Sequence, residues 1–271
     1  MEKFIFKNQE LLLERHVSIS INDRGFLFGD GVFETCKIFN GRIYDFKSHL
    51  ARLQSSLKNL KIEADISNIE QQSLQLIAKN SMVNGMLKIN ISRGSGSLGY
   101  LPNDCAKPLI IIQTLEERSF PTMITLGLST IKAPLNDFGK STNSLPYVMN
   151  KISAQEAGLF DCVMLSEKGF ICETSSANIF WVTNGEIFTP SLSCNILAGT
   201  TRKRLMELSS IKIVEIEADI SALRDADEIF LTNSSFLILP VDAFQDRKLS
   251  KNYGSSLLEL MQEDLAKSCK N

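Results

Sequence analysis

Histidine is scarce in this chain of 271 residues, which contains only His16 and His49. The six cysteines form no C-x-x-C pair and have no histidines at metal-ligand spacing. We therefore expect no metal site and no dependence on a histidine base. Most of the cysteines stand beside apolar residues, which favours buried, reduced thiols in a cytoplasmic protein.

The chain also lacks a large excess of positive or negative charge, and it lacks long apolar runs. The chain has 29 Lys and Arg against 31 Asp and Glu, a net charge of -2, so a strong electrostatic footprint for nucleic acid or anionic membrane is excluded. The apolar runs are short and stay well below the roughly 18 residues of a membrane span. No secretory signal is expected. We expect a globular protein that acts on a small molecule.

Common catalytic fingerprints are missing as well. The chain has no G-x-S-x-G elbow, no G-x-x-x-x-G-K-[ST] loop and no H-E-x-x-H pair. The stretch 94–99 matches G-x-G-x-x-G, but Tyr100-Leu101-Pro102 follows it, and the dinucleotide fingerprint needs a helix at that point. We interpret this stretch as a flexible loop between two strands.

Hydrophobic periodicity predicts strands and helices mixed in both halves of the chain, without strict βαβ alternation. This mixture favours an α+β fold. Asn40-Gly41 and Asn184-Gly185 predict hairpin turns, because both residue types tolerate positive φ. Apolar residues at helical spacing over 50–60 predict an amphipathic helix, and the capping-box pattern at 256–259 predicts the start of the C-terminal helix.

The polar, charged stretch 115–122 ends near a proline and is the best candidate for a linker. We predict a small N-terminal α+β domain at 1–115, an interdomain linker at 116–122 and a larger, β-rich domain at 123–271.

Four separated stretches carry residues with chemical potential. The stretch 23–35 packs three glycines and two aspartates into a turn that enters a strand, and 46–53 places Arg52 beside the apolar stripe of a helix. The stretch 140–146 places Lys140 ahead of a helix. The fourth stretch begins at Glu173 and continues to residue 202.

In this order the four motifs resemble the class IV, fold-type IV pyridoxal-phosphate enzymes. These are branched-chain and D-amino-acid aminotransferases and 4-amino-4-deoxychorismate lyases, and the resemblance runs from about residue 4 to 242. It implies a two-domain fold-type IV architecture, the cofactor pyridoxal 5′-phosphate, a homodimer, and Lys140 in the larger domain as the residue that forms the Schiff base.

The chemistry of the residues agrees with this resemblance. A lysine amine forms a Schiff base with a carbonyl cofactor and, once displaced, transfers protons, although a single loop lysine is usually only solvated. Pyridoxal phosphate is an electron sink that needs a carboxylate against its ring nitrogen, and Glu173 matches the family's residue. The alternative for Glu173 is a surface glutamate at a strand end.

A phosphate dianion needs hydrogen-bond donors. Gly199, Thr200 and Thr201 precede a helix whose free N–H groups and dipole suit an anion, and threonine capping of the same helix is compatible with this role. The resemblance further implies that Arg52 binds the phosphate and that Leu197 packs on the cofactor ring. It also implies a second phosphate-side loop with Asn233 and Ser234.

The lyases resemble this chain best among the family members. Branched-chain aminotransferases have a tyrosine where this chain has Leu145, and the stretch 97–100 lacks the arginine and histidine that D-amino-acid aminotransferases use to trap a carboxylate. The stretches 87–100, 140–145 and 232–233 match the lyases, although 140–145 is shared with the D-amino-acid enzymes. Many lyases have a basic residue where this chain has Leu98.

The resemblance implies conversion of 4-amino-4-deoxychorismate to 4-aminobenzoate and pyruvate, a step toward folate. Thr35 is a candidate proton relay, or alternatively a strand-pairing hydroxyl. A transaminase for D-alanine or, less closely, branched-chain substrates remains an alternative. Two hypotheses from other functional classes remain. One is a protein that binds the cofactor without catalysis and would tolerate loss of Lys140, and the other is a nucleotide-binding module on the glycine loop.

Overall fold

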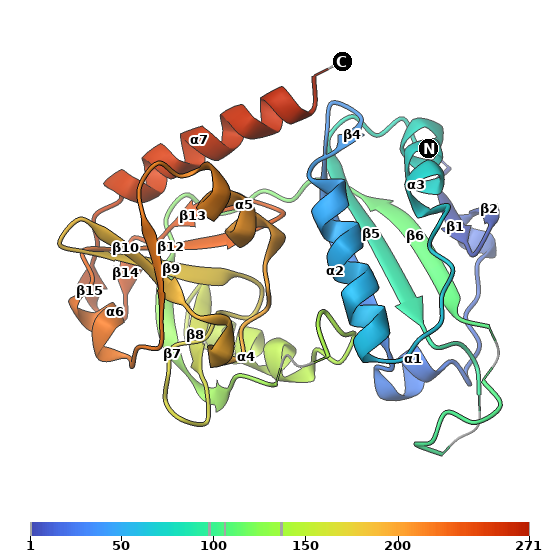
Figure 1. Ribbon diagram of the computed structural model, residues 1–271, viewed down its shortest axis with the longest axis horizontal. Helices are drawn as coiled ribbons and strands as arrows, with labels where there is room; N and C mark the ends of the chain where they lie inside the picture. The colour runs from blue at the N-terminus through green and yellow to red at the C-terminus, as the bar shows by residue number, and fades with distance from the viewer. Residues whose placement is uncertain (1, 97–98, 106, 136–137, 271) are drawn as a thin grey trace. The chain divides into compact units, whose positions relative to one another are not determined.

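A computed structural model describes residues 2–96, 99–105, 107–135 and 138–270. The chain divides into two compact units (Figure 1). The first unit comprises Met1–Arg118, Phe138–Ser144 and Leu265–Asn271, and the second comprises Ser119–Asp137 and Leu145–Asp264. Each unit combines helices with sheets, which confirms the predicted α+β class.

The first unit is built on a six-stranded sheet in the order β2-β1-β6-β5-β3-β4. Helices α2 and α3 cover one face of this sheet (Figure 1), where Leu53, Leu57 and Leu76 pack against Val32 and Cys36. Its elements are β1 (Phe4–Lys7), β2 (Glu10–Leu13), η1 (Glu14–His16), α1 (Arg24–Phe28), β3 (Gly31–Phe39), β4 (Arg42–Ile43), α2 (Phe46–Asn59), α3 (Ile69–Lys79), β5 (Gly85–Ser92) and β6 (Leu109–Leu115).

The local signals in this unit gave the expected elements. Asn40-Gly41, with φ of 50° and 72°, forms the hairpin turn between β3 and β4, as predicted. The glycine-rich stretch joins β5 to β6 without a helix in its described part, so the interpretation as a loop is confirmed for that part. The short helix α1 was not predicted; Asp23 caps it by accepting hydrogen bonds from two backbone N–H groups.

The second unit contains two sheets, in the orders β11-β10-β9-β12-β13 and β15-β14-β7-β8. One apolar core joins them, since Leu126 and Val163 of the smaller sheet cluster with Ile179 and Trp181 of the larger. The elements are β7 (Thr125–Lys132), α4 (Leu145–Glu156), β8 (Asp161–Leu165), β9 (Asn178–Thr183), β10 (Glu186–Pro190), η2 (Leu192–Cys194), α5 (Thr200–Leu208), β11 (Ile213–Ile216), α6 (Ser221–Asp225), β12 (Glu228–Asn233), β13 (Leu237–Pro240), β14 (Ala243–Phe244), β15 (Arg247–Lys248) and most of α7 (Asn252–Ser268), which from Leu265 onward is grouped with the first unit.

The start of the C-terminal helix differs from the prediction. Helix α7 begins at Asn252, so the capping box predicted at 256–259 is wrong, and Ser256 instead donates to the Asn252 carbonyl within the helix. The buried carboxylate of Glu228 accepts the backbone N–H groups of Asn252, Tyr253 and Gly254. A distant side chain thus satisfies the first N–H donors, which local sequence patterns do not reveal.

The remaining hairpin prediction is confirmed, because Asn184-Gly185 turns between β9 and β10. Within the described ranges, none of the helices has the length and apolar character that crossing a membrane requires.

Candidate active site

Lys140 lies in a short irregular segment that is bonded to the start of β3 through an isolated bridge between Ser141 and Val32. The Phe33 N–H donates to the Lys140 carbonyl at 3.0 Å, and the Lys140 N–H donates to the Ser56 hydroxyl at 3.2 Å. These bonds group residues 138–144 with the first unit, whereas the sequence analysis placed Lys140 in the C-terminal domain. The difference arises because the backbone groups of a short irregular segment bond to whichever part of the fold lies beside it, and chain order does not indicate which part that is.

The backbone just before Lys140 is tightly constrained. Gly139 has φ of +78°, a conformation that glycine adopts without strain. A Cβ at this position would collide with the Ser56 hydroxyl on α2. The glycine therefore allows the lysine segment to approach the helix closely.

The Lys140 ammonium lies over the ring of Phe33, with Nζ 4.5 Å from the ring centroid. Phe33 and Thr35 are two apart on β3, so both side chains face away from the α2 and α3 side of the sheet. Lys88 pairs directly with Thr35, and its Nζ lies 5.6 Å from the centroid of the same Phe33 ring. Two lysine ammonium groups thus lie near one aromatic ring. The sequence analysis gave Lys88 no role, although its place between apolar residues of β5 shows which face it occupies.

Arg52 on α2 belongs to a buried ion-pair network whose centre is Glu34 on β3. Its Nε and Nη2 each donate to one oxygen of Glu34 at 2.7 Å, and Nδ1 of His49 lies 2.7 Å from the Glu34 carboxylate. Burial raises the pKa of Glu34, but hydrogen bonds and charge from Arg52 and His49 outweigh it and lower that pKa to about 2. The sequence analysis assigned neither Glu34 nor His49; the scarcity of histidine did not indicate that one of the two is buried in a charged network.

Glu173 is a buried carboxylate of the second unit, as Glu34 is of the first. Its carboxylate is 4% exposed and accepts three hydrogen bonds: the Tyr147 hydroxyl to Oε1, and the Asn178 amide and the Leu197 N–H to Oε2, each at 3.0 Å. Hydrogen bonds to a carboxylate favour its charged form and fix its direction. Tyr147 and Asn178 were missed by the sequence analysis.

Helix α5 begins immediately beside this carboxylate. The Asn178 amide also donates to the Leu197 carbonyl at 2.9 Å, which ties the segment before the helix to β9. Gly199 is the N-cap and provides no side-chain cap, and the side chains of Thr200 and Thr201 in the first turn are buried. A Cβ at Gly199 would collide with the Asn178 amide oxygen.

Strand β12 ends at Asn233, and Ser234 follows it, next to these groups. Thr232 pairs with Asn178 across the β9–β12 ladder. This pairing brings the loop after β12 close to Asn178, which donates to Glu173. The Asn233 side chain donates to the Ser176 carbonyl and accepts the N–H groups of Ser235 and Phe236. Asn233 therefore shapes its own loop through its side chain, and the half-buried Ser234 is the next residue of that loop.

The sequence-derived site residues thus fall into two sets. In the first unit, Lys140 and Thr35 share one face of the sheet through Phe33, and Arg52 lies on α2. In the second unit, Asn178 contacts Glu173 and Leu197 and lies against Gly199. The other predicted residues are neighbours of these contacts in the chain: Thr200 and Thr201 follow Gly199, and Asn233 and Ser234 follow Thr232, which pairs with Asn178. Ser97 and Leu98, on which the comparison with the lyases partly depended, lie outside the described residues.

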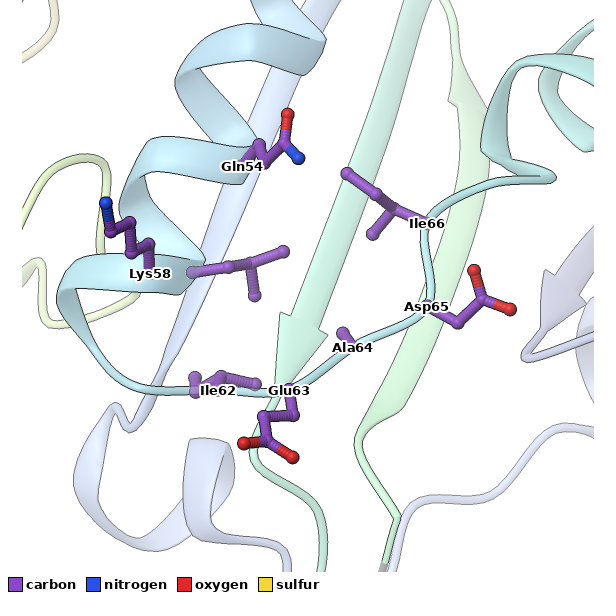
Figure 2. Close-up of a pocket in the computed structure, with 8 residues that line it drawn as sticks. Gln54, Lys58, Ile62, Glu63, Ala64, Asp65 and Ile66 are labelled. Atoms are coloured by element: carbon purple, nitrogen blue, oxygen red, sulfur yellow. The ribbon is translucent and has the colours of Figure 1, made fainter.

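A surface hollow of about 440 Å³ lies elsewhere on the first unit (Figure 2). It is formed by the end of α2 and the stretch 62–66, and none of the sequence-derived site residues lines it. In the part of the chain that the structure describes, no group of three or more His, Cys, Asp or Glu side chains is placed to hold a metal ion.

The profile of the family described as amino-transferase class IV matches residues 31–244. The chain belongs to this family. Enzymes of class IV depend on pyridoxal 5′-phosphate, so the chain is an enzyme with that cofactor. The resemblance inferred from the four motifs is confirmed.

Relatives with different activities are similarly close. An aminotransferase of Methanocaldococcus jannaschii, provisionally named for branched-chain amino acids, is 31% identical and covers 96% of this chain and 94% of its own. Aminodeoxychorismate lyase of Bacillus subtilis is 29% identical, with 93% and 88% covered, and D-alanine aminotransferase of Bacillus licheniformis is 27% identical, with 96% and 95% covered.

Solved structures of the family share the fold. The 4-amino-4-deoxychorismate lyase of Pseudomonas aeruginosa superimposes with a TM-score of 0.86 at 26% identity, covering 96% of this chain and 99% of that one. The expected fold-type IV architecture is therefore confirmed.

The residues of the second unit fit the cofactor. A buried carboxylate held by three donors suits a protonated ring nitrogen, and an α-helix that begins without a side-chain cap suits a phosphate. A Cβ at Gly199 would collide with the Asn178 side chain. Glycine at this position therefore lets the backbone at the start of α5 lie close to Asn178.

Proposed function

We propose that this enzyme is a lyase that converts 4-amino-4-deoxychorismate to 4-aminobenzoate and pyruvate, a reaction that supplies folate synthesis. The observation that carries the proposal is the pair of ammonium groups at Phe33, from Lys140 and Lys88. The substrate bears two carboxylates and an amine. One lysine is needed for the amine chemistry, and the second provides a positive charge for a carboxylate.

The cofactor supplies an electron sink for the substrate's amine-bearing carbon. When the cofactor is bound, Lys140 would hold it through its amine, and Glu173 would be the carboxylate partner of its ring nitrogen. Leu197 would supply an apolar contact to the ring. The residues that would donate to its phosphate are Arg52, Gly199, Thr200, Thr201, Asn233 and Ser234.

The reaction requires one proton removal and one bond cleavage. The freed Lys140 amine removes the proton from the substrate's ring carbon, and Thr35, on the same face of the sheet, relays a proton. The ring becomes aromatic as its C–O bond breaks, and the electron pair leaves with the enolpyruvyl oxygen. Protonation of the leaving group yields pyruvate, so no keto acid is consumed.

We also propose that the enzyme works as a cytoplasmic homodimer. Large apolar side chains of the first unit are strongly exposed in the single chain, including Ile21 at 77%, Phe26 at 72% and Leu101 at 66%. Exposed apolar groups of this size are typical of surfaces that a partner covers. The six thiols are free, which supports a reducing compartment. Analytical ultracentrifugation of the loaded enzyme tests the dimer.

The lyase proposal is tested by two assays on the same preparation. Aminodeoxychorismate is supplied without any keto acid, and 4-aminobenzoate and pyruvate are followed; D-alanine is then supplied with 2-oxoglutarate. We expect equal amounts of both products in the first assay and none from Lys140→Ala. Turnover only in the second assay rejects the lyase in favour of a D-amino-acid transaminase, the alternative that the Bacillus licheniformis relative supports.

A further inference from the structure

We propose that Tyr147 is a positioning residue that keeps the proton on the cofactor's ring nitrogen by hydrogen bonding to Glu173. The inference rests on the proposed function, since it requires the cofactor's ring nitrogen to face Glu173. It concerns a residue for which the sequence motifs give no role.

The tyrosine hydroxyl is a donor to one oxygen of the Glu173 carboxylate. Tyr147 lies in the first turn of α4, is half-buried, and donates its hydroxyl to Oε1 of Glu173 at 3.0 Å. The other oxygen, Oε2, accepts the Asn178 amide and the Leu197 N–H. The carboxylate is therefore held from both sides, by α4 on one oxygen and by β9 and the segment before α5 on the other.

These hydrogen bonds decide where a shared proton resides. A proton between a pyridine nitrogen and a carboxylate moves toward whichever group binds it more strongly, and each donor to the carboxylate weakens that group as a proton acceptor. The Tyr147 hydroxyl thus favours the protonated ring, which is the stronger electron sink. Without it, the carboxylate draws the proton away from the ring.

Replacement of Tyr147 by phenylalanine separates this role from packing. The Tyr147 ring contacts an apolar cluster that includes Met164, Cys172 and Ile196, and a phenylalanine ring keeps those contacts while losing only the hydroxyl. Tyr253→Phe is the matched control, because Tyr253 is also half-buried in the second unit and lies at the start of α7.

The test is the ¹⁵N chemical shift of the ring nitrogen in enzyme loaded with ¹⁵N-labelled pyridoxal 5′-phosphate. We expect the wild type and Tyr253→Phe to show a protonated nitrogen, and Glu173→Gln to show an unprotonated one. Tyr147→Phe should shift toward the Glu173→Gln value, with kcat reduced about tenfold, as expected for loss of a hydrogen bond to a charged group, and KM little changed.

An unchanged shift in Tyr147→Phe, with a normal melting temperature, overturns the role of Tyr147 while leaving the proposed function intact. A wild type that takes up no labelled cofactor overturns the proposed function and this inference together. A protonated wild type with a shifted Tyr147→Phe supports both.

Discussion

Glu34→Gln removes the central charge of the buried network in the first unit. Glu34 is fully buried, and Arg52 and His49 contact its two oxygens at 2.7 Å. Its pKa falls from 4.5 to about 2, which corresponds to about 3 kcal/mol of stability at pH 7. Glutamine also leaves the Arg52 guanidinium without its anionic partner, which is costly for a side chain only 12% exposed.

The lowered pKa of Glu34 determines how the stability difference changes with pH. Because folding lowers the pKa of Glu34, its contribution is fully present above pH 4.5 and is lost as the pH falls toward 2. The charge-dependent part of the difference between wild type and Glu34→Gln should therefore be about 3 kcal/mol at pH 7 and about 2 kcal/mol at pH 3.5. Other carboxylates titrate in both proteins and cancel in this difference.

Urea unfolding at a series of pH values measures this difference. Glu63→Gln serves as the control, because Glu63 is exposed and its replacement should change stability by less than about 0.5 kcal/mol. A Glu34→Gln protein as stable as the control at pH 7, or a difference that does not change between pH 7 and 3.5, would refute the reasoning.

Three further changes have expected outcomes. Gly199→Ala should weaken cofactor binding at least about tenfold in a fluorescence titration, because its Cβ collides with Asn178 and displaces the start of α5. Arg24→Lys should speed amide exchange near Tyr100, because the guanidinium of Arg24 donates to the carbonyls of the neighbouring loop at 2.7 and 2.9 Å. Lys88→Met should raise KM for aminodeoxychorismate about tenfold or more and leave the uptake of cofactor unchanged; a normal KM removes Lys88 from the substrate site.

Local chemistry determined which elements sequence reasoning could predict. The turn at Asn40-Gly41 follows from two residues that tolerate positive φ, and the helix now labelled α2 follows from apolar residues on one face. The start of α7 could not be predicted, because its N–H donors are satisfied by Glu228, far away in the chain. The pairing of the Lys140 segment with β3 could not be predicted either, because the two segments lie far apart in the chain.

The candidate site residues could be predicted from local motifs, but the side chains that hold them in place could not. The four motifs indicated the family, and the family model confirms it. The motifs did not reveal which side chains hold the proposed site residues in place. Glu34 and His49 around Arg52, and Tyr147 and Asn178 around Glu173, come from other segments and meet their partners only in the folded chain.

Reduction of the purified enzyme with borohydride tests the central claim most directly. The account predicts that reduction fixes one pyridoxyl-phosphate group per chain and that peptide mapping finds it on Lys140, with none fixed in Lys140→Ala. A group fixed to another lysine, or a wild type that retains no cofactor after reduction, would contradict the assignment of Lys140 and with it the proposed lyase.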